Sequence, residues 1–98
     1  MIKAWNLQGR TGDAVKNQIV VEKWSVGKHE CWFCSYGHTV AHISAKGIIT
    51  FDKTGWNYST TTGKYLNQFL REFTSYNTGR EAIKAEAVKF ADLNSSLR

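Results

Sequence analysis

Residues 33–73 read FCSYGHTVAHISAKGIITFDKTGWNYSTTTGKYLNQFLREF. In the first half, β-branched and aromatic residues recur between polar ones, and Gly37 and Gly47 interrupt the runs, which is typical of antiparallel strands joined by tight turns. In the second half, apolar residues recur at helical spacing and would form one wide stripe. These residues are Tyr65, Leu66, Phe69, Leu70 and Phe73. The stretch therefore predicts antiparallel strands followed by a helix that packs on one face of their sheet.

The sequence before this stretch adds further strands. Residues 19–26 are rich in β-branched side chains, and residues 2–7 can form a short additional strand. The main part of the predicted sheet is therefore about 18–52. Alternation along residues 38–44 predicts one buried face and one more polar face. The buried set is Thr39, Ala41 and Ile43, and the opposite set is His38, Val40, His42 and Ser44.

Two helices are predicted to follow the sheet, over about 61–75 and about 79–93. One of three adjacent hydroxyl side chains should cap the first helix by accepting a hydrogen bond from a free N–H group. They are Ser59, Thr60 and Thr61. Thr78 and Glu81 have the spacing of a capping box at the start of the second helix. We therefore predict an α+β fold with an antiparallel meander of three to five strands and two helices, formed by residues 1–98 as a single domain.

The chain is basic and rich in aromatic residues. Its 98 residues carry a net charge of +5, and 13% of them are Phe, Trp or Tyr. A basic surface favours acidic partners such as nucleic acid, and rings that do not fit a small core often mark a recognition surface. No apolar run approaches the roughly 20 residues of a membrane helix, and the first residues lack the apolar segment of a signal peptide. We therefore expect a cytoplasmic protein.

One segment combines thiol and imidazole groups, which are the ligands that zinc prefers. Its candidate ligands are His29, Cys31, Cys34 and His38. A zinc-stabilised interaction module is therefore one alternative, although Cys31 and Cys34 in a strand would point to opposite faces about 10 Å apart along the chain. The Cys-x-x-Cys spacing also lacks the helix N-terminus that activates a redox thiolate. The prediction is a protein without metal or cofactor.

No arrangement of residues predicts catalysis. The 8 acidic residues are scattered along the chain, and no nucleophile lies in an elbow motif, so the chain is predicted not to be an enzyme. Gly63-Lys64 is similar to part of a phosphate-binding loop, but Tyr65 stands where that loop has the magnesium-binding Ser or Thr. The free N–H groups at the start of the helix could still bind an anion together with Lys64.

Two motifs resemble those of a family of small bacteriophage proteins of unknown function. They are Ser35-Tyr36-x-His38-Thr39-Val40-Ala41 and Tyr58-Ser59-x-Thr61-Thr62-x-Lys64-Tyr65, the second followed by Phe69-Leu70. The family pattern is a Ser-Tyr-x-Thr-x-Val-Ala strand, a short hairpin and a Tyr-Ser-x-Thr-Thr-x-x-His helix start. This chain departs from the pattern at Gly37-His38, where one extra residue intervenes, and at Tyr65, which replaces the His. The resemblance implies viral origin, the cytoplasm of an infected bacterial cell and an accessory role.

The leading functional prediction is a protein that acts by binding. By analogy with other small phage proteins, it would engage or inhibit a host protein or protein–nucleic acid complex, either a nucleic-acid-processing machine or a restriction or CRISPR-type defence effector. The predicted partner-binding surface combines aromatic, hydroxyl and basic side chains. Its residues are Tyr36, Lys53, Trp56, Tyr58, Thr61 and Lys64.

A direct DNA- or RNA-binding module is the main alternative. Lys and Arg side chains would contact phosphates while aromatic rings stack on bases. The candidate rings are Trp24, Trp32, Tyr36, Trp56 and Tyr58. Salt separates the two predictions, because affinity for nucleic acid falls steeply as the salt concentration rises.

Overall fold

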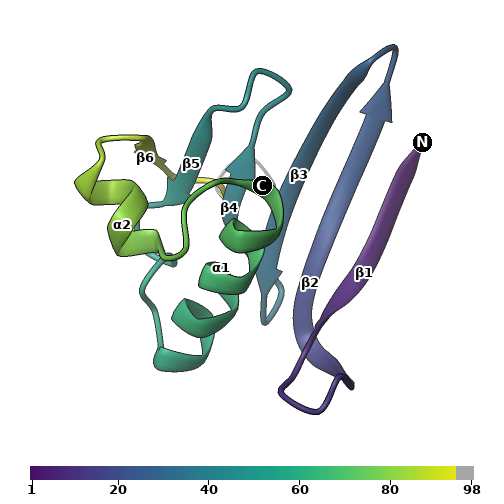
Figure 1. Ribbon diagram of the computed structural model, residues 1–98, viewed down its shortest axis with the longest axis vertical. Helices are drawn as coiled ribbons and strands as arrows, with labels where there is room; N and C mark the ends of the chain where they lie inside the picture. The colour runs from purple at the N-terminus through teal and green to yellow at the C-terminus, as the bar shows by residue number, and fades with distance from the viewer. Residues whose placement is uncertain (95–98) are drawn as a thin grey trace.

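The computed structural model describes residues 1–94, which form one six-stranded sheet and two helices (Figure 1). The strands are β1 (Ile2–Gln8), β2 (Ala14–Ser25), β3 (Lys28–Ser35), β4 (His38–Ile43), β5 (Ile49–Asp52) and β6 (Val88–Ala91), and the helices are α1 (Thr60–Phe73) and α2 (Gly79–Lys84). Strand order follows the chain; β1 to β5 are antiparallel to their neighbours, and β6 runs parallel to β5. The predicted α+β class with two helices is confirmed. The sheet, however, is mixed and larger than the predicted meander of three to five strands.

The second helix is shorter than predicted, because the chain returns to the sheet. α2 ends at Lys84, and Glu86 has a φ of 57°, a left-handed conformation that is typical of a helix end. The predicted helix over 79–93 is therefore wrong beyond α2. Instead, β6 pairs with the edge of β5, where Val88 lies opposite Ile49. This pairing satisfies backbone groups along an edge that would otherwise be open.

Both helices begin at the predicted hydroxyl caps. The Ser59 Oγ accepts a hydrogen bond from the Thr62 N–H at 3.1 Å at the start of α1. At the start of α2, the Thr78 Oγ1 accepts one from the Glu81 N–H at 3.0 Å. Each bond satisfies a backbone N–H group that has no partner within its helix. The sequence therefore located the start of each helix correctly.

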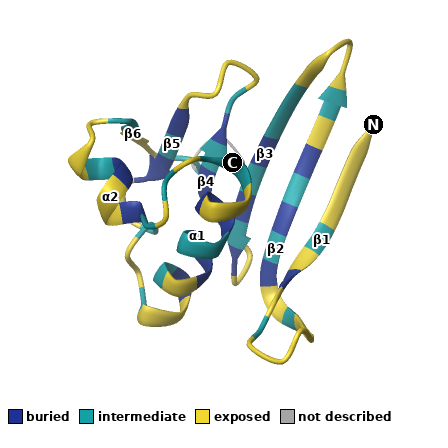
Figure 2. Ribbon diagram, in the orientation of Figure 1, coloured by how far each residue is buried: buried dark blue, intermediate teal, exposed yellow. Residues whose placement is uncertain are grey.

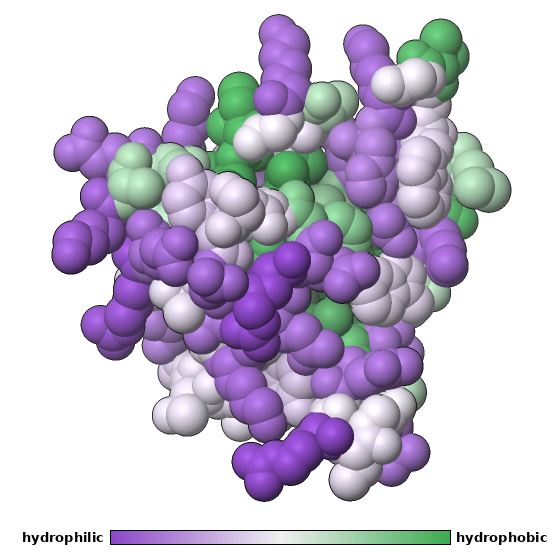
Figure 3. Space-filling view, in the orientation of Figure 1, coloured by the Kyte–Doolittle hydropathy of each residue, from purple (hydrophilic) through white to green (hydrophobic). Residues whose placement is uncertain are grey.

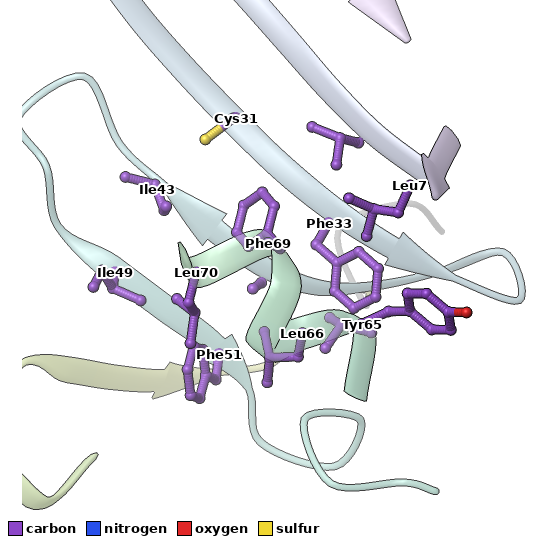
Figure 4. Close-up of a cluster of buried hydrophobic side chains, with 13 residues drawn as sticks. Leu7, Cys31, Phe33, Ile43, Ile49, Phe51, Tyr65, Leu66, Phe69 and Leu70 are labelled. Carbon is purple, nitrogen blue, oxygen red and sulfur yellow. The ribbon is translucent and has the colours of Figure 1, made fainter. Parts of the chain in front are cut away.

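The apolar stripe of α1 forms the core with the sheet (Figure 2 and Figure 4). Phe69 stacks on Phe33 of β3 with ring centroids 5.8 Å apart, and both side chains are fully buried. Leu66 and Leu70 are buried in the same cluster, while Phe73 packs against its edge. Burial of one such side chain contributes about 1.5–3 kcal/mol. The predicted packing of this helix on one sheet face is confirmed.

A β-bulge in β4 changes which of its residues face α1. Phe33 pairs with Ala41 but Cys34 pairs with Thr39, so Val40 is an extra residue in β4. Thr39 consequently lies on the face away from α1, with its hydroxyl 3.9 Å from the Cys34 Sγ, whereas Val40 is buried in the core. The predicted alternation is therefore wrong before Ala41 and correct after it, because a bulge shifts the pleat by one residue.

The two helices lie on the same side of the sheet, in front of it in Figure 1. On the other side, strand pairing aligns Val21, Trp32 and His42 across β2, β3 and β4. All three side chains are only partly buried, and the Trp32 and His42 rings stack with centroids 5.0 Å apart. This side of the sheet, uncovered by either helix, is referred to below as the open face.

Candidate functional site

A groove of about 840 Å³ lies at the N-terminal end of α1. The helix side of the molecule is largely hydrophilic (Figure 3), so a partner there would be recognised by specific groups rather than by broad apolar contact. The groove walls come from the β3–β4 turn, the end of β5 and the loop after it, the first turn of α1 and the chain after β6. Its lining residues are Ser35, Tyr36, His38, Val40, Asp52, Thr54, Gly55, Tyr58, Ser59, Thr61, Thr62, Asp92 and Asn94.

Three of the predicted partner-binding residues line this groove. Tyr36 stands in the β3–β4 turn with 52% of its surface exposed, and Tyr58 stands in the loop before α1 with 79% exposed. Thr61 lies in the first turn of α1. The fold therefore brings together aromatic and hydroxyl groups from segments that are far apart along the chain.

The other three predicted residues lie outside the groove. Trp56 is half-buried and packs against the core, with its ring centroid 6.0 Å from that of Phe51. Lys64 places its Nζ 5.3 Å from the ring centroid of Tyr65, and neither Lys64 nor Lys53 is among the lining residues. The groove therefore contains two of the predicted aromatic side chains but not the predicted basic ones.

A chain of hydroxyl groups joins the two sides of the groove. The hydroxyls of Ser35 and Thr62 lie 3.0 Å apart within the interior, and the Ser59 Oγ donates to the Thr62 Oγ1 at 3.2 Å. Ser35 ends β3, whereas Ser59 and Thr62 begin α1. These bonds fix the β3–β4 turn against the helix and hold the groove in one shape.

Two lining residues outside the predicted partner-binding set fasten the other walls. Asp52 accepts a hydrogen bond from the Leu93 N–H at 2.9 Å and another from the Thr54 hydroxyl at 3.1 Å. Asn94 accepts from the Thr39 N–H at 2.9 Å and donates to the Thr39 carbonyl at 3.1 Å. The chain after β6 is thus tied both to the end of β5 and to the edge of β4.

The role of Asp52 left a signal in the sequence. An Asp at the end of an apolar strand and three residues before a Gly is typical of a β-turn. In the structure the Gly55 N–H donates to the Asp52 carbonyl, and a Cβ at Gly55 would lie 2.9 Å from the Asp52 Oδ2. The role of Asn94 left no signal in the sequence, because it depends on where the chain after β6 runs. That segment passes the edge of β4, where Asn94 bonds to Thr39. The sequence did not reveal β6, because Ile83, Ala87, Phe90 and Ala91 lie at helical spacing.

The groove is acidic, although the protein as a whole carries a net charge of +5. Asp52 and Asp92 line it together with His38, and none of the described lining residues is Lys or Arg. Carboxylates repel phosphate at short range. The anion site suggested by Lys64 and the free N–H groups of the helix start therefore does not fit this arrangement.

The alternative zinc site is not assembled by the fold. Its predicted ligands were His29, Cys31, Cys34 and His38. Cys31 pairs with Glu22 on the side of α1, whereas Cys34 pairs with Ile19 on the open face. Residues 1–94 contain no cluster of three or more His, Cys, Asp or Glu side chains that could hold a metal ion.

The same geometry argues against redox chemistry at the two cysteines. Burial, reinforced by the charges of Glu22 and Glu30, raises the pKa of Cys31 to about 12. Burial also raises the pKa of Cys34, although a hydrogen bond to Thr39 acts in the opposite direction. A reactive thiol needs a lowered pKa, so both groups are in the wrong environment for that role.

The fold and the groove define a class of protein: a six-stranded mixed sheet with helices on one side and a polar, aromatic-walled groove at a helix start. The model of a family of unknown function, DUF8033, matches residues 5–86, and the chain belongs to this family. No curated protein and no solved structure matches the chain. Within residues 1–94, neither helix has the length and hydrophobicity needed to cross a lipid bilayer.

Proposed function

We propose that this protein acts by binding another protein and that the groove at the start of α1 is its binding surface. The observation that carries the proposal is the convergence of two exposed tyrosines, Tyr36 and Tyr58, on one preformed groove. Tyrosine is enriched at protein interfaces because its ring supplies contact area and its hydroxyl a hydrogen bond. A groove held in shape by internal hydrogen bonds also loses little entropy when a partner binds.

The proposed partner is a host protein or protein–nucleic acid complex in a bacterial cell. This part of the proposal is supported by the resemblance of the motifs at residues 35–41 and 58–65 to small phage proteins. The protein would then serve as an accessory factor that engages or inhibits a nucleic-acid-processing or defence complex, without catalysis of its own. Acidic groups in the groove favour contact with a protein component rather than with phosphate.

Affinity capture from bacterial lysate, with and without nuclease, tests this proposal. Wild-type protein should retain a defined host protein after nuclease treatment, and Tyr58→Ala should lose it. Ile48→Ala is the matched control, since Ile48 is also exposed but lies in the β4–β5 turn, outside the groove. Recovery of nuclease-sensitive material alone, or equal capture by Tyr58→Ala, would contradict the proposal.

Direct nucleic-acid binding is a second candidate, and the open face is the surface that favours it. Trp32 lies there, stacked on His42, and strand pairing places Lys23 and Lys89 on the same face. Rings on an open sheet with nearby cations can stack bases and contact phosphates. Under this candidate, Trp32→Ala weakens binding of a single-stranded oligonucleotide, affinity falls steeply with salt, and Tyr58→Ala has no effect.

A further inference from the structure

We infer that the groove receives a cationic side chain, arginine or lysine, from the partner protein. This inference rests on the proposed function and adds the chemistry that would be recognised. It depends on three features of the groove: a buried carboxylate at its wall, two exposed aromatic rings, and lining residues that do not themselves supply a Lys or Arg.

Asp52 supplies the buried carboxylate. Only 3% of its surface is exposed, and its hydrogen bonds come from two neutral donors, the Leu93 N–H and the Thr54 hydroxyl. Among residues 1–94, no Lys, Arg or His forms a salt bridge with it. Buried carboxylates are nearly always paired with a cation, and each carboxylate oxygen can accept more than one hydrogen bond. Asp52 therefore lacks, among residues 1–94, the cationic partner that a buried carboxylate usually has.

Tyr36 and Tyr58 supply the aromatic walls. A cation over the face of a tyrosine ring is attracted by the ring quadrupole, and a planar guanidinium can stack on the ring while it donates to a carboxylate. Both tyrosines line the groove that Asp52 also lines. Aromatic faces and a carboxylate around one hollow match a cationic side chain better than they match an anion or an aliphatic group.

The groove is also preorganised for such a ligand. The hydroxyls of Ser35, Thr62 and Ser59 hold one wall to the other, and Gly55 lets the loop approach the Asp52 carboxylate so closely that a Cβ there would lie 2.9 Å from it. A site that is already ordered loses less conformational entropy when its ligand binds. The groove walls and the Asp52 carboxylate are therefore in place before a partner arrives.

The test is a titration of the isotope-labelled protein with N-acetyl-arginine amide, followed by NMR at pH 7.5 and constant ionic strength. We expect saturable shifts at the backbone amides of Tyr36, Tyr58 and Thr61 with a dissociation constant of order 1–10 mM, as expected for a small single-group ligand. The matching citrulline compound, which is neutral but has the same shape, and inorganic phosphate should each produce no saturable shift. Equal binding of the citrulline compound, stronger binding of phosphate, or no saturable shift with the arginine compound would overturn the inference.

Variants assign the effect to the groove. Asp52→Asn should lower the affinity for the arginine compound by about tenfold, because a charge-assisted hydrogen bond is lost. Tyr58→Ala should lower this affinity by about threefold, because a cation–π contact is lost. Asp13→Asn removes the same charge from the exposed β1–β2 loop and should leave the affinity unchanged; an equal loss in this control would overturn the inference. Tyr58 is 79% exposed, so Tyr58→Ala should fold normally. It can therefore test the inference even if Asp52→Asn unfolds.

The outcomes separate this inference from the proposed function. Loss of protein capture in Tyr58→Ala without any binding of the arginine compound would remove the cationic ligand but leave the protein-binding groove. Specific binding of the arginine compound without nuclease-resistant capture would support the cationic site and contradict the proposed function.

Discussion

The imidazole of His29 lies with its Nε2 3.0 Å from the Glu22 Oε1, on the side of the sheet that faces α1. The other carboxylate oxygen of Glu22 accepts a hydrogen bond from the indole N–H of Trp5. The ring of Trp24 stacks on His29 with centroids 4.9 Å apart, and Phe73 of α1 approaches the same imidazole. A buried carboxylate therefore joins β1, β2 and β3 beneath the C-terminal end of the helix.

Removal of this carboxylate should destabilise the fold. In Glu22→Ala the Trp5 N–H and the His29 ring lose their acceptor while they stay partly buried, so the free energy of unfolding should fall by about 1–3 kcal/mol. Urea denaturation followed by tryptophan fluorescence measures the change. Glu30→Ala is the matched control, because Glu30 pairs with His42 at 3.3 Å on the open face. The Glu30 side chain is 32% exposed against 11% for Glu22, and the loss there should stay below about 1 kcal/mol. Equal losses in the two variants would contradict this account.

Asp52 should be required for the C-terminal part of the sheet. Asp52→Ala leaves the Leu93 N–H without its acceptor and removes the tie between β5 and the chain after β6. We expect the free energy of unfolding to fall by about 2–3 kcal/mol, with faster amide exchange at Val88 and Phe90, which pair with β5. Asp13→Ala, in an exposed loop, should change stability by less than about 0.5 kcal/mol. Unchanged exchange in β6 of Asp52→Ala would disprove this role.

The two cysteines should differ in reactivity. Because the pKa of Cys31 is raised to about 12, only about one in ten thousand of its thiols is ionised at pH 8, and the thiolate is the reactive form. Cys34 is less buried and faces away from α1, so iodoacetamide should modify it first. Mass spectrometry of peptides from the folded protein measures the order. As pH rises from 8 to 10, the Cys31 rate should keep increasing, because its pKa lies above this range, whereas in urea both thiols should approach a plateau near pH 9–10. A Cys31 rate equal to that of Cys34 in the folded protein would refute the expectation.

The sequence was sufficient where a signal is local. The hydroxyl at Ser59 and the spacing of Thr78 and Glu81 depend only on neighbours within one helical turn, and both helix starts were predicted correctly. The stripe from Tyr65 to Phe73 was likewise predictable, since periodicity alone identifies the buried face of a helix.

The parts that could not be predicted depend on pairing between distant segments. The bulge at Val40 arises from the register of β4 against β3, which alternation within one strand cannot show. Phe90 fits a helical stripe with Ile83, Ala87 and Ala91 as well as it fits a strand. Its pairing with Phe51 at the edge of β5 is what makes it part of a strand. The acidic character of the groove also depends on β6, because Asp92 follows that strand. Tyr36 and Tyr58 were predicted as partner-binding residues together with Trp56, but the sequence did not show that Trp56 packs against the core instead. It showed Asp52 only as a turn residue and not as a carboxylate at the wall of the same groove.

Two hairpin turns each hold a bulky residue in a left-handed conformation, which strains the backbone. Val26-Gly27 joins β2 to β3 with φ angles of 39° and 75°, and Tyr36-Gly37 joins β3 to β4 with φ angles of 52° and 83°. Turns with positive φ at both central positions strongly prefer Asn-Gly, and a left-handed residue other than Gly, Asn or Asp costs about 1–2 kcal/mol.

Val26→Asn and Tyr36→Asn should therefore each raise the free energy of unfolding by about 0.5–1 kcal/mol. Val26 is fully exposed at the tip of its hairpin, outside the groove, so relief of its strain should leave partner capture and binding of the arginine compound unchanged. Tyr36 lines the groove, so the same substitution there should weaken both. Thermal denaturation and the NMR titration, carried out on the same two variants, measure the two effects. A Tyr36→Asn variant that is more stable and binds as well as wild type would show that the strained tyrosine is tolerated at the turn without serving the groove.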